Sequence, residues 1–271
     1  MELDRASRTA ERVAERRALH QLLDVPPVFV DPLALRFLRP EVAASIAADP
    51  GAHDSRVSRY LRAFLAARSR FAEDEVAKAV ARGVSQYVIV GAGYDTFAYR
   101  NPFDGLRVFE VDHPATQDDK RAHVTELPEA IGNVSFVSMD FERESLDTVL
   151  ERAGHDHAVP TCWIWEGVVM YLTREAMRAT LAGVARRSAR GSTLIVNYHE
   201  AHRRFVARVI FWLIGEPQIS AWTPEEMSSD LRSAGFMVRD DSGMADWNAR
   251  FAQGAARVER GAYMRVATAR I

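Results

Sequence analysis

The 271-residue sequence predicts an α/β fold, with an open, mostly parallel sheet and helices on both of its faces. From about residue 84 onward, short β-prone runs alternate with stretches of helical character. Several runs, such as "QYVIV" at 86–90, are apolar nearly throughout, which is typical of strands buried on both faces. The same run leads into "GAGYDT", and a turn after the first strand commonly forms part of the ligand site in such sheets.

Two long helices are expected before the sheet begins. Residues 2–23 are rich in Ala, Arg, Glu and Leu and contain neither Gly nor Pro, which favours a helix. The segment "DVPPVFVDPLA" ends that helix with three prolines. A second helical region runs from about 55 to 82 and ends before Gly83.

The sequence from 84 onward is expected to supply the sheet and its covering helices. Strands are predicted at 86–90, 107–111, 134–138, 161–165, 192–198, 236–239 and 263–268, and helices at 114–126, 144–153, 173–189 and 223–234. Thr173 is the expected N-cap of one helix, and Trp163 and Trp165 are expected in the core. The final two strands lack an obvious crossover helix between them, so they are predicted to pair antiparallel at an edge.

We expect one domain of four parts: a helical cap (1–83), a binding core (84–199), an inserted helical lid (200–222) and the last part of the sheet (223–271). The insertion contains "FVARVIFWLIG", which is apolar around most of a helix. Phe205, Val209 and Trp212 would wall an acceptor pocket if this segment is a lid. A dimer contact and plain core are the alternatives.

Composition excludes several classes of protein. The formal net charge is −2, from 35 Lys and Arg against 37 Asp and Glu, so no electrostatic attraction to nucleic acid or to an anionic membrane is expected. The longest apolar stretch, 209–214, is too short to span a bilayer. The single cysteine, Cys162, cannot form an internal disulfide, and the charged N-terminal residues do not resemble a secretory signal. These features predict a soluble cytoplasmic protein, and the sequence shows no strong metal-ligand cluster.

The glycine turn restricts the choice of ligand. Gly91 and Gly93, on either side of Ala92, allow a tight turn and a close approach to a ligand. A dinucleotide fingerprint would require a third glycine, but Thr96 stands in its place. Asp112 ends the second strand about twenty residues after the turn, where a carboxylate can accept both hydroxyls of a ribose.

The third strand is followed by "MDF", which suggests an adenine site. Asp140 can accept from an adenine amino group, and Phe141 can pack on the ring. The alternative is that Asp140 caps the next helix. Asp95 and Thr96 have a similar alternative, as caps of a helix after the glycine turn.

Six motifs together resemble the leucine carboxyl methyltransferase family, including its bacterial S-adenosylmethionine-dependent branch. They are "VDPLA", "RSRFAED", "GAGYDTFAYR", "FEVDHPATQDDK", "MDF" and "WEGVVMYLT", in the family's order over roughly residues 5–200. The resemblance implies a class I methyltransferase (Rossmann-like) fold of seven strands, the last inserted antiparallel, and S-adenosylmethionine as the cofactor.

The resemblance also implies roles for particular residues. Gly91, Ala92 and Gly93 would border the methionine part of the cofactor. Asp112 would hold the ribose, and Asp140 and Phe141 the adenine, although the family often has Leu where Phe141 stands. Arg68, the first arginine of "RSRF", would pair with the cofactor's carboxylate, and Glu166 of "WEGV" would lie beside the cofactor. The family's N-terminal basic residue corresponds to Arg16 or Arg17, and a solvated helix residue is the alternative for Arg68.

The expected function is O-methylation of a carboxylate, phenol or alcohol on a small, largely apolar or aromatic, polyketide-like acceptor of secondary metabolism. A carboxylate is already ionised and needs no base, whereas a phenol or alcohol would need one. His199, Tyr171 and Tyr198 are the candidates for that base, and the alternative for His199 is a solvated or structural role. A protein C-terminal carboxylate as the acceptor, an NAD-dependent oxidoreductase and a non-catalytic cofactor-binding protein remain alternative functions. The protein is expected as a monomer or a homodimer.

Overall fold

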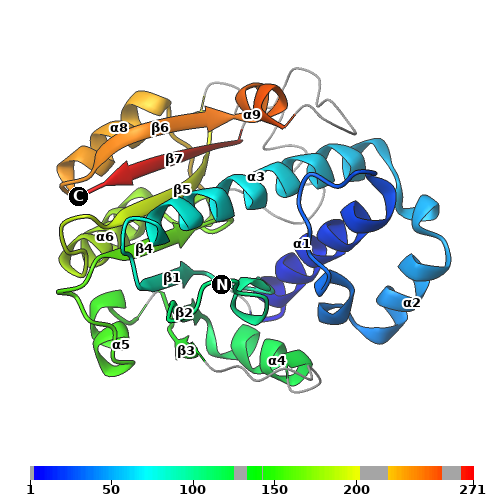
Figure 1. Ribbon diagram of the computed structural model, residues 1–271, viewed down its shortest axis with the longest axis horizontal. Coiled ribbons are helices and arrows are strands. Elements are labelled where there is room, and N and C mark those ends of the chain that lie inside the picture. The colour runs from blue at the N-terminus through cyan, green and yellow to red at the C-terminus, as the bar shows by residue number, and fades with distance from the viewer. Residues whose placement is uncertain (1–2, 125–132, 142, 202–218, 252–263) are drawn as a thin grey trace.

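The computed structural model describes residues 3–124, 133–141, 143–201, 219–251 and 264–271 (Figure 1). All seven strands of this part of the chain lie in one sheet with the order β3-β2-β1-β4-β5-β7-β6. The strands are β1 (Gln86–Val90), β2 (Arg107–Asp112), β3 (Val134–Ser138), β4 (Thr161–Trp165), β5 (Thr193–His199), β6 (Met237–Gly243) and β7 (Met264–Arg270). These bounds agree closely with the predicted ranges, except that β6 continues to Gly243, beyond the predicted end at residue 239.

The first five strands are parallel, and β7 enters antiparallel between β5 and β6. This order and the reversed β7 confirm the expected class I methyltransferase sheet. The expected edge pair of the last two strands is confirmed as well, since β6 and β7 pair antiparallel. The register of β6 against β7 shifts between Val238 and Asp240.

The helices of the described part are α1 (Leu3–Leu23), α2 (Pro40–Ala48), α3 (Arg56–Val80), α4 (Pro114–Val124), α5 (Leu146–Arg152), α6 (Arg174–Arg186), α8 (Pro224–Ser233) and α9 (Met244–Arg250). Thr173 caps α6 as predicted, because its hydroxyl accepts from the backbone N–H of Ala176 at 3.1 Å. The short helices α2 and α9 were not expected from the sequence. Phe205, Val209 and Trp212 of the expected lid lie outside the described residues.

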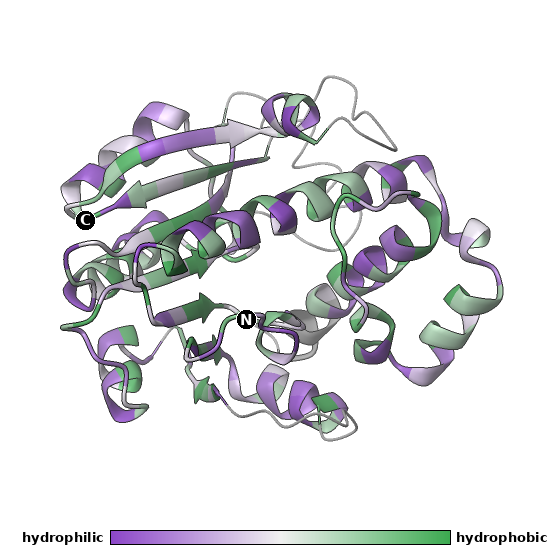
Figure 2. Cartoon of the chain, in the orientation of Figure 1, coloured by the Kyte–Doolittle hydropathy of each residue, from purple (hydrophilic) through white to green (hydrophobic). Residues whose placement is uncertain are grey.

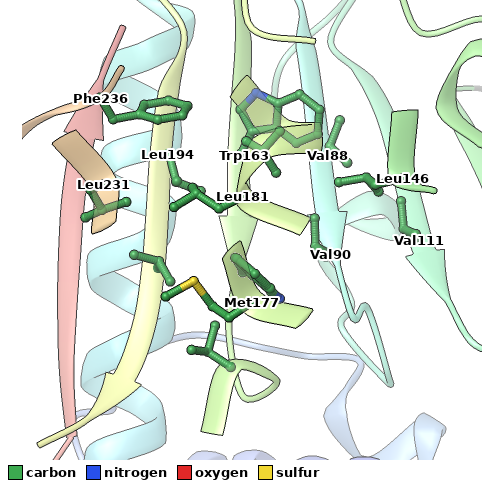
Figure 3. Packing of buried hydrophobic residues seen from close by; sticks show 14 of the residues in the cluster. Val88, Val90, Val111, Leu146, Trp163, Met177, Leu181, Leu194, Leu231 and Phe236 are labelled. Carbon is green, nitrogen blue, oxygen red and sulfur yellow. The ribbon is translucent and has the colours of Figure 1, made fainter. Parts of the chain in front are cut away.

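Each face of the sheet is covered by its own set of helices. On one face, side chains of β1, β2, β4 and β5 meet α5, α6 and α8, and Figure 3 shows Val88, Trp163 and Leu194 beside Leu181 and Leu231. On the other face, alternate strand residues meet α3 and α9. Trp163 and Trp165 are fully buried, as predicted. The strands are therefore hydrophobic on both sides, which Figure 2 shows for the centre of the sheet.

The N-terminal helices form a smaller core beyond the carboxyl ends of the strands. Ala14, Ala18 and Leu19 of α1 pack with Phe37 and with Tyr94 of the glycine turn segment. Figure 1 places α1 and α2 beyond the arrowheads of β1, β2 and β3. Helix α1 thus lies against the edge where a ligand is expected. Among the described helices, none has the length and apolarity needed to cross a membrane.

Candidate functional site

The glycine turn after β1 is held between two other segments. Gly91 and Gly93 have positive φ of 75° and 47°, a region that non-glycine residues rarely adopt. The turn folds back on β2, since the N–H of Gly91 donates to Val111 O at 2.8 Å. A Cβ added to Gly91 would lie 2.2 Å from Cγ2 of Val168, and one added to Gly93 would lie 3.2 Å from Cβ of Ala10. Both glycines are therefore needed where the turn meets α1 and the segment after β4.

Asp112 at the end of β2 is tied to that turn. Its side chain accepts from the backbone N–H of Gly93 and, at 2.6 Å, from that of His113. The residue is only 8% exposed. Burial raises the pKa of the Asp112 carboxyl, although the two N–H donors oppose the rise. The structure thus brings Asp112 and Gly93 together.

Asp140 and Phe141 lie after β3, at the same edge of the sheet as the end of β2. The backbone N–H of Met139 donates to Asp112 O at 2.9 Å, which joins the two strand ends. The backbone O of Asp140 accepts from Arg143 and Glu144, so this residue does begin a helical turn. Phe141 is partly buried and packs against the core on the α5 side of the sheet. The next helix, α5, begins at Leu146 with Ser145 as its N-cap, so the alternative that Asp140 caps this helix is wrong.

Arg68 of α3 and Glu166 after β4 form an ion pair, with 2.9 Å between Nε and Oε2. Their side chains are 10% and 14% exposed, so Arg68 is not a solvated helix residue. Burial raises the pKa of the Glu166 carboxyl, and the charge of Arg68 opposes the rise. The second oxygen, Oε1, is buried and has no hydrogen-bond partner in the part of the chain described. A buried carboxylate oxygen without a partner is costly, and an ammonium group could satisfy it.

Of the two arginines left open in α1, Arg17 reaches the glycine turn. Its guanidinium donates to Thr96 Oγ1 at 2.7 Å and to Tyr94 O at 3.3 Å, and it pairs with Asp31. Arg16 instead donates to the carbonyl of Arg12 on its own helix, at 2.8 Å. Arg17 is therefore the residue that links α1 to the turn.

The segment after the turn differs from the expected helix. Only a three-residue 3-10 helix (Phe97–Tyr99) follows. Asp95 acts as its cap, because its Oδ1 accepts from the N–H of Phe97 at 2.8 Å. Thr96 does not cap, because its hydroxyl accepts from Arg17 and Arg100 instead.

The candidate bases occupy different environments. His199 ends β5 and is 4% exposed, which excludes a solvated histidine. Tyr171 ends a 3-10 helix (Val169–Tyr171) after β4 and is partly exposed. Tyr198 is fully buried and donates to Asp241 Oδ2 at 2.7 Å. Burial and the Asp241 carboxylate raise the pKa of Tyr198. Since its hydroxyl donates to Asp241 of β6, Tyr198 is a structural residue and not a candidate base.

Sequence reasoning missed Asn197 and Val168. Asn197 of β5 accepts from both Arg68 and Gly167, and a polar residue inside the apolar run "STLIVNY" was the available signal. Val168 lies beside Gly91 of the glycine turn, and its place in the motif "WEGVVMYLT" was the available signal. In the described ranges, no three His, Cys, Asp or Glu side chains gather as metal ligands would.

Comparison with known proteins gives the family. The model of the leucine carboxyl methyltransferase family matches residues 10–185. A protein of Streptomyces coelicolor, named "Putative S-adenosyl-L-methionine-dependent methyltransferase", is 35% identical over 192 residues, which are 69% of this chain and 66% of that protein. A Bacillus subtilis protein of the same description is 28% identical over 282 residues and 92% of each chain. This chain thus spans slightly less than two thirds of the length of the Streptomyces relative.

A solved structure agrees on the fold. The crystal structure of a "putative methyltransferase" from Thermobifida fusca aligns with a TM-score of 0.60 and 18% identity, over 85% of this chain and 88% of that one. The matched residues 10–185 include the glycine turn, Asp112, Arg68 and Glu166. The chain belongs to the leucine carboxyl methyltransferase family.

Proposed function

We propose that this chain binds S-adenosylmethionine at the carboxyl edge of its sheet and transfers the cofactor's methyl group to an oxygen atom of a small acceptor. The observation that carries the proposal is the buried Arg68–Glu166 pair. Its two opposite charges match the carboxylate and the ammonium of an amino acid. Glu166 Oε1 is buried without a hydrogen-bond partner in the described part of the chain, and the ammonium of the cofactor would supply one.

The remaining side chains fit the other parts of the cofactor. The backbone of the glycine turn, at the carboxyl end of β1, would border the methionine part. Asp112 would accept from the ribose hydroxyls, and Asp140 and Phe141 would take the adenine. The cofactor supplies the reactive sulfonium methyl, so the chain's own task is to orient the acceptor and exclude water. Orientation of this kind contributes roughly 7–11 kcal/mol to lowering a barrier.

An NAD-dependent oxidoreductase is disfavoured by the segment after β1. A dinucleotide diphosphate sits at the N-terminus of an α-helix that follows the glycine turn. Here a three-residue 3-10 helix follows instead. The hydroxyl of Thr96 in this segment accepts hydrogen bonds from Arg17 and Arg100 of the chain itself. The family assignment counts against this alternative too.

For the acceptor, we propose a small, largely apolar or aromatic acid or phenol. A carboxylate would need no base, whereas a phenol would need one, and His199 and Tyr171 are the candidates. His199 lies at the carboxyl end of β5 and is shielded from water, which suits a residue that removes a proton inside a closed site. A protein C-terminal carboxylate is the alternative acceptor. A protein that binds the cofactor without catalysis is the alternative function. We take the chain to act as a single cytoplasmic domain, as a monomer or homodimer, without nucleic acid or membrane as a partner.

Calorimetry with S-adenosylmethionine and with NAD tests the cofactor. We expect binding of the first only, and binding of NAD alone would overturn the proposal. A methyl-transfer assay with a panel of carboxylic acids, phenols and a peptide carboxylate then tests the acceptor. In the variant His199→Gln, transfer to a phenol should fall at least roughly a hundredfold, which is the usual contribution of a general base, while transfer to a carboxylate should change little. Equal loss for both acceptors would show that His199 is structural.

A further inference from the structure

The side chain of Asn197 connects the candidate cofactor pair to the last strand of the sheet. Asn197 lies in β5, two residues before its end, and is fully buried. Its Oδ1 accepts from Arg68 Nη1 and from the N–H of Gly167, each at 3.3 Å. Its Nδ2 donates to the carbonyl of Arg265 in β7 at 3.0 Å. One amide thus touches three elements that are far apart in the chain.

These partners fix the orientation of the amide. Arg68 Nη1 and the Gly167 N–H can only donate, and the carbonyl of Arg265 can only accept. A reversed amide would place its NH₂ group against two donors and its oxygen against another oxygen. All three hydrogen bonds would then be lost in a buried position. The observed orientation is therefore the only one that the surroundings allow.

The bonds to Arg68 and Gly167 lock the two charged groups relative to each other. Arg68 points Nε toward Glu166 and Nη1 toward Asn197. Gly167 follows Glu166 directly, in a conformation with a φ of 71°. Asn197 therefore holds the guanidinium and the turn that carries the Glu166 carboxylate at the same time.

Asn197 is uncharged, so it does not compete with a ligand for the positive charge of Arg68. An aspartate here would accept the same two hydrogen bonds, but it would add a second carboxylate beside Arg68. The carboxylate of a ligand would then have to compete with it for the guanidinium. An amide holds Arg68 in place and leaves its charge for a ligand.

We infer that Asn197 is a positioning residue for the amino-acid end of S-adenosylmethionine: it sets the relative placement of Arg68 and Glu166 without contacting the reacting atoms. This inference rests on the proposed cofactor site. It extends the site to β5 and β7, beyond the residues that the family motifs indicate.

The test compares two ligands by calorimetry. S-adenosylhomocysteine carries the whole amino-acid end, whereas 5′-methylthioadenosine has the same nucleoside and sulfur without it. Asn197→Ala should raise the Kd of S-adenosylhomocysteine roughly five- to tenfold, the scale of one or two lost hydrogen bonds. The Kd of 5′-methylthioadenosine should stay within about twofold, because the ribose and adenine sites are untouched.

A matched control and a second variant separate positioning from stability. Thr193→Val removes the hydroxyl that accepts from Arg82 at 3.1 Å, at the other end of β5, and should change neither Kd. Asn197→Ser keeps a small polar group and replaces the alanine variant if that variant does not fold. In an Arg68→Ala background, the change at Asn197 should add less than about twofold, because both changes act on the same contact.

The outcomes are distinguishable. If the wild-type chain binds neither ligand, the proposed function itself is wrong. If Asn197→Ala or Asn197→Ser weakens both ligands equally, or weakens neither, the proposed function stands and Asn197 is only structural. Selective loss of S-adenosylhomocysteine supports the inference.

Discussion

Replacing His155 should make the stability of the protein less sensitive to mild acid. His155 follows α5 and is 3% exposed. Its Nδ1 accepts from Arg187 Nε at 3.3 Å, and its Nε2 lies 3.0 Å from Thr161 Oγ1. Since Arg187 can only donate, Nδ1 carries no proton, and the neutral imidazole donates through Nε2. The folded protein therefore holds His155 in its neutral form.

Burial, and then the charge of Arg187, lower the pKa of His155 from 6.5 to about 4. A difference of this size corresponds to roughly 3 kcal/mol. Between pH 6.5 and pH 4 the unfolded chain takes up a proton at this residue and the folded chain does not. Unfolding becomes more favourable as the pH falls through that window, so the contribution of His155 is complete above pH 6.5 and is lost toward pH 4.

The variant His155→Gln removes the titrating group and can still donate to Thr161. We expect it to be less stable than the wild type at pH 7, because Arg187 loses an acceptor. The difference in unfolding free energy between wild type and variant, from urea titrations, should shrink by roughly 3 kcal/mol between pH 7 and pH 4. Other titrating groups are common to both proteins and cancel. A difference that stays constant over this range would refute the reasoning.

Three further predictions concern the cofactor site. Asp112→Asn should weaken binding of S-adenosylhomocysteine roughly tenfold in calorimetry, since bonds to a charged acceptor contribute roughly 1.5–3 kcal/mol; unchanged affinity would remove Asp112 from the site. Arg68→Lys keeps the charge but not the fork of donors, so it should weaken the binding of S-adenosylhomocysteine more than that of 5′-methylthioadenosine. An equal loss of affinity for both ligands would mean that Arg68 only stabilises the fold. Gly91→Ala should lower the melting temperature more than Gly83→Ala, because both glycines have positive φ but only a Cβ at Gly91 would meet Val168. Equal changes in melting temperature would mean that the Val168 side chain moves aside without destabilising the protein.

Sequence patterns predicted the sheet well because burial on both faces leaves a clear mark. Strands such as β1 and β4 are apolar after their first residue, and a glycine or an acid follows each of them directly. The helices α2 and α9 were missed. Helix α9, "MADWNAR", is only seven residues long, and its apolar residues meet α3, far away in the chain. Local periodicity carries little information about so short a segment.

From position alone, the candidate site was predictable where an acid ends a strand or follows it directly, whereas Arg68, in the middle of α3, was indicated only by the family motif. Asp112 and Glu166 are such acids, and an acid in that position is costly unless it has a task. Asn197 lies inside a strand, and its contacts to Arg68 and Gly167 are separated from it by 129 and 30 residues. The choice between Arg16 and Arg17 likewise depends on how α1 rotates against the glycine turn. Contacts of this kind arise from tertiary packing, so no local pattern could reveal them.

The antiparallel β7 has a consequence for the order in which the protein becomes competent. A ribosome completes β1 to β6 before it adds β7, yet β7 is the strand that lies between β5 and β6. Until it is added, β5 has an open edge, and Asn197 lacks the carbonyl of Arg265. Arg68 and Glu166 can already meet at that stage, but the amide that aligns them is not yet anchored. On the inference made above, the alignment of this charge pair is therefore complete only after β7 has paired with β5.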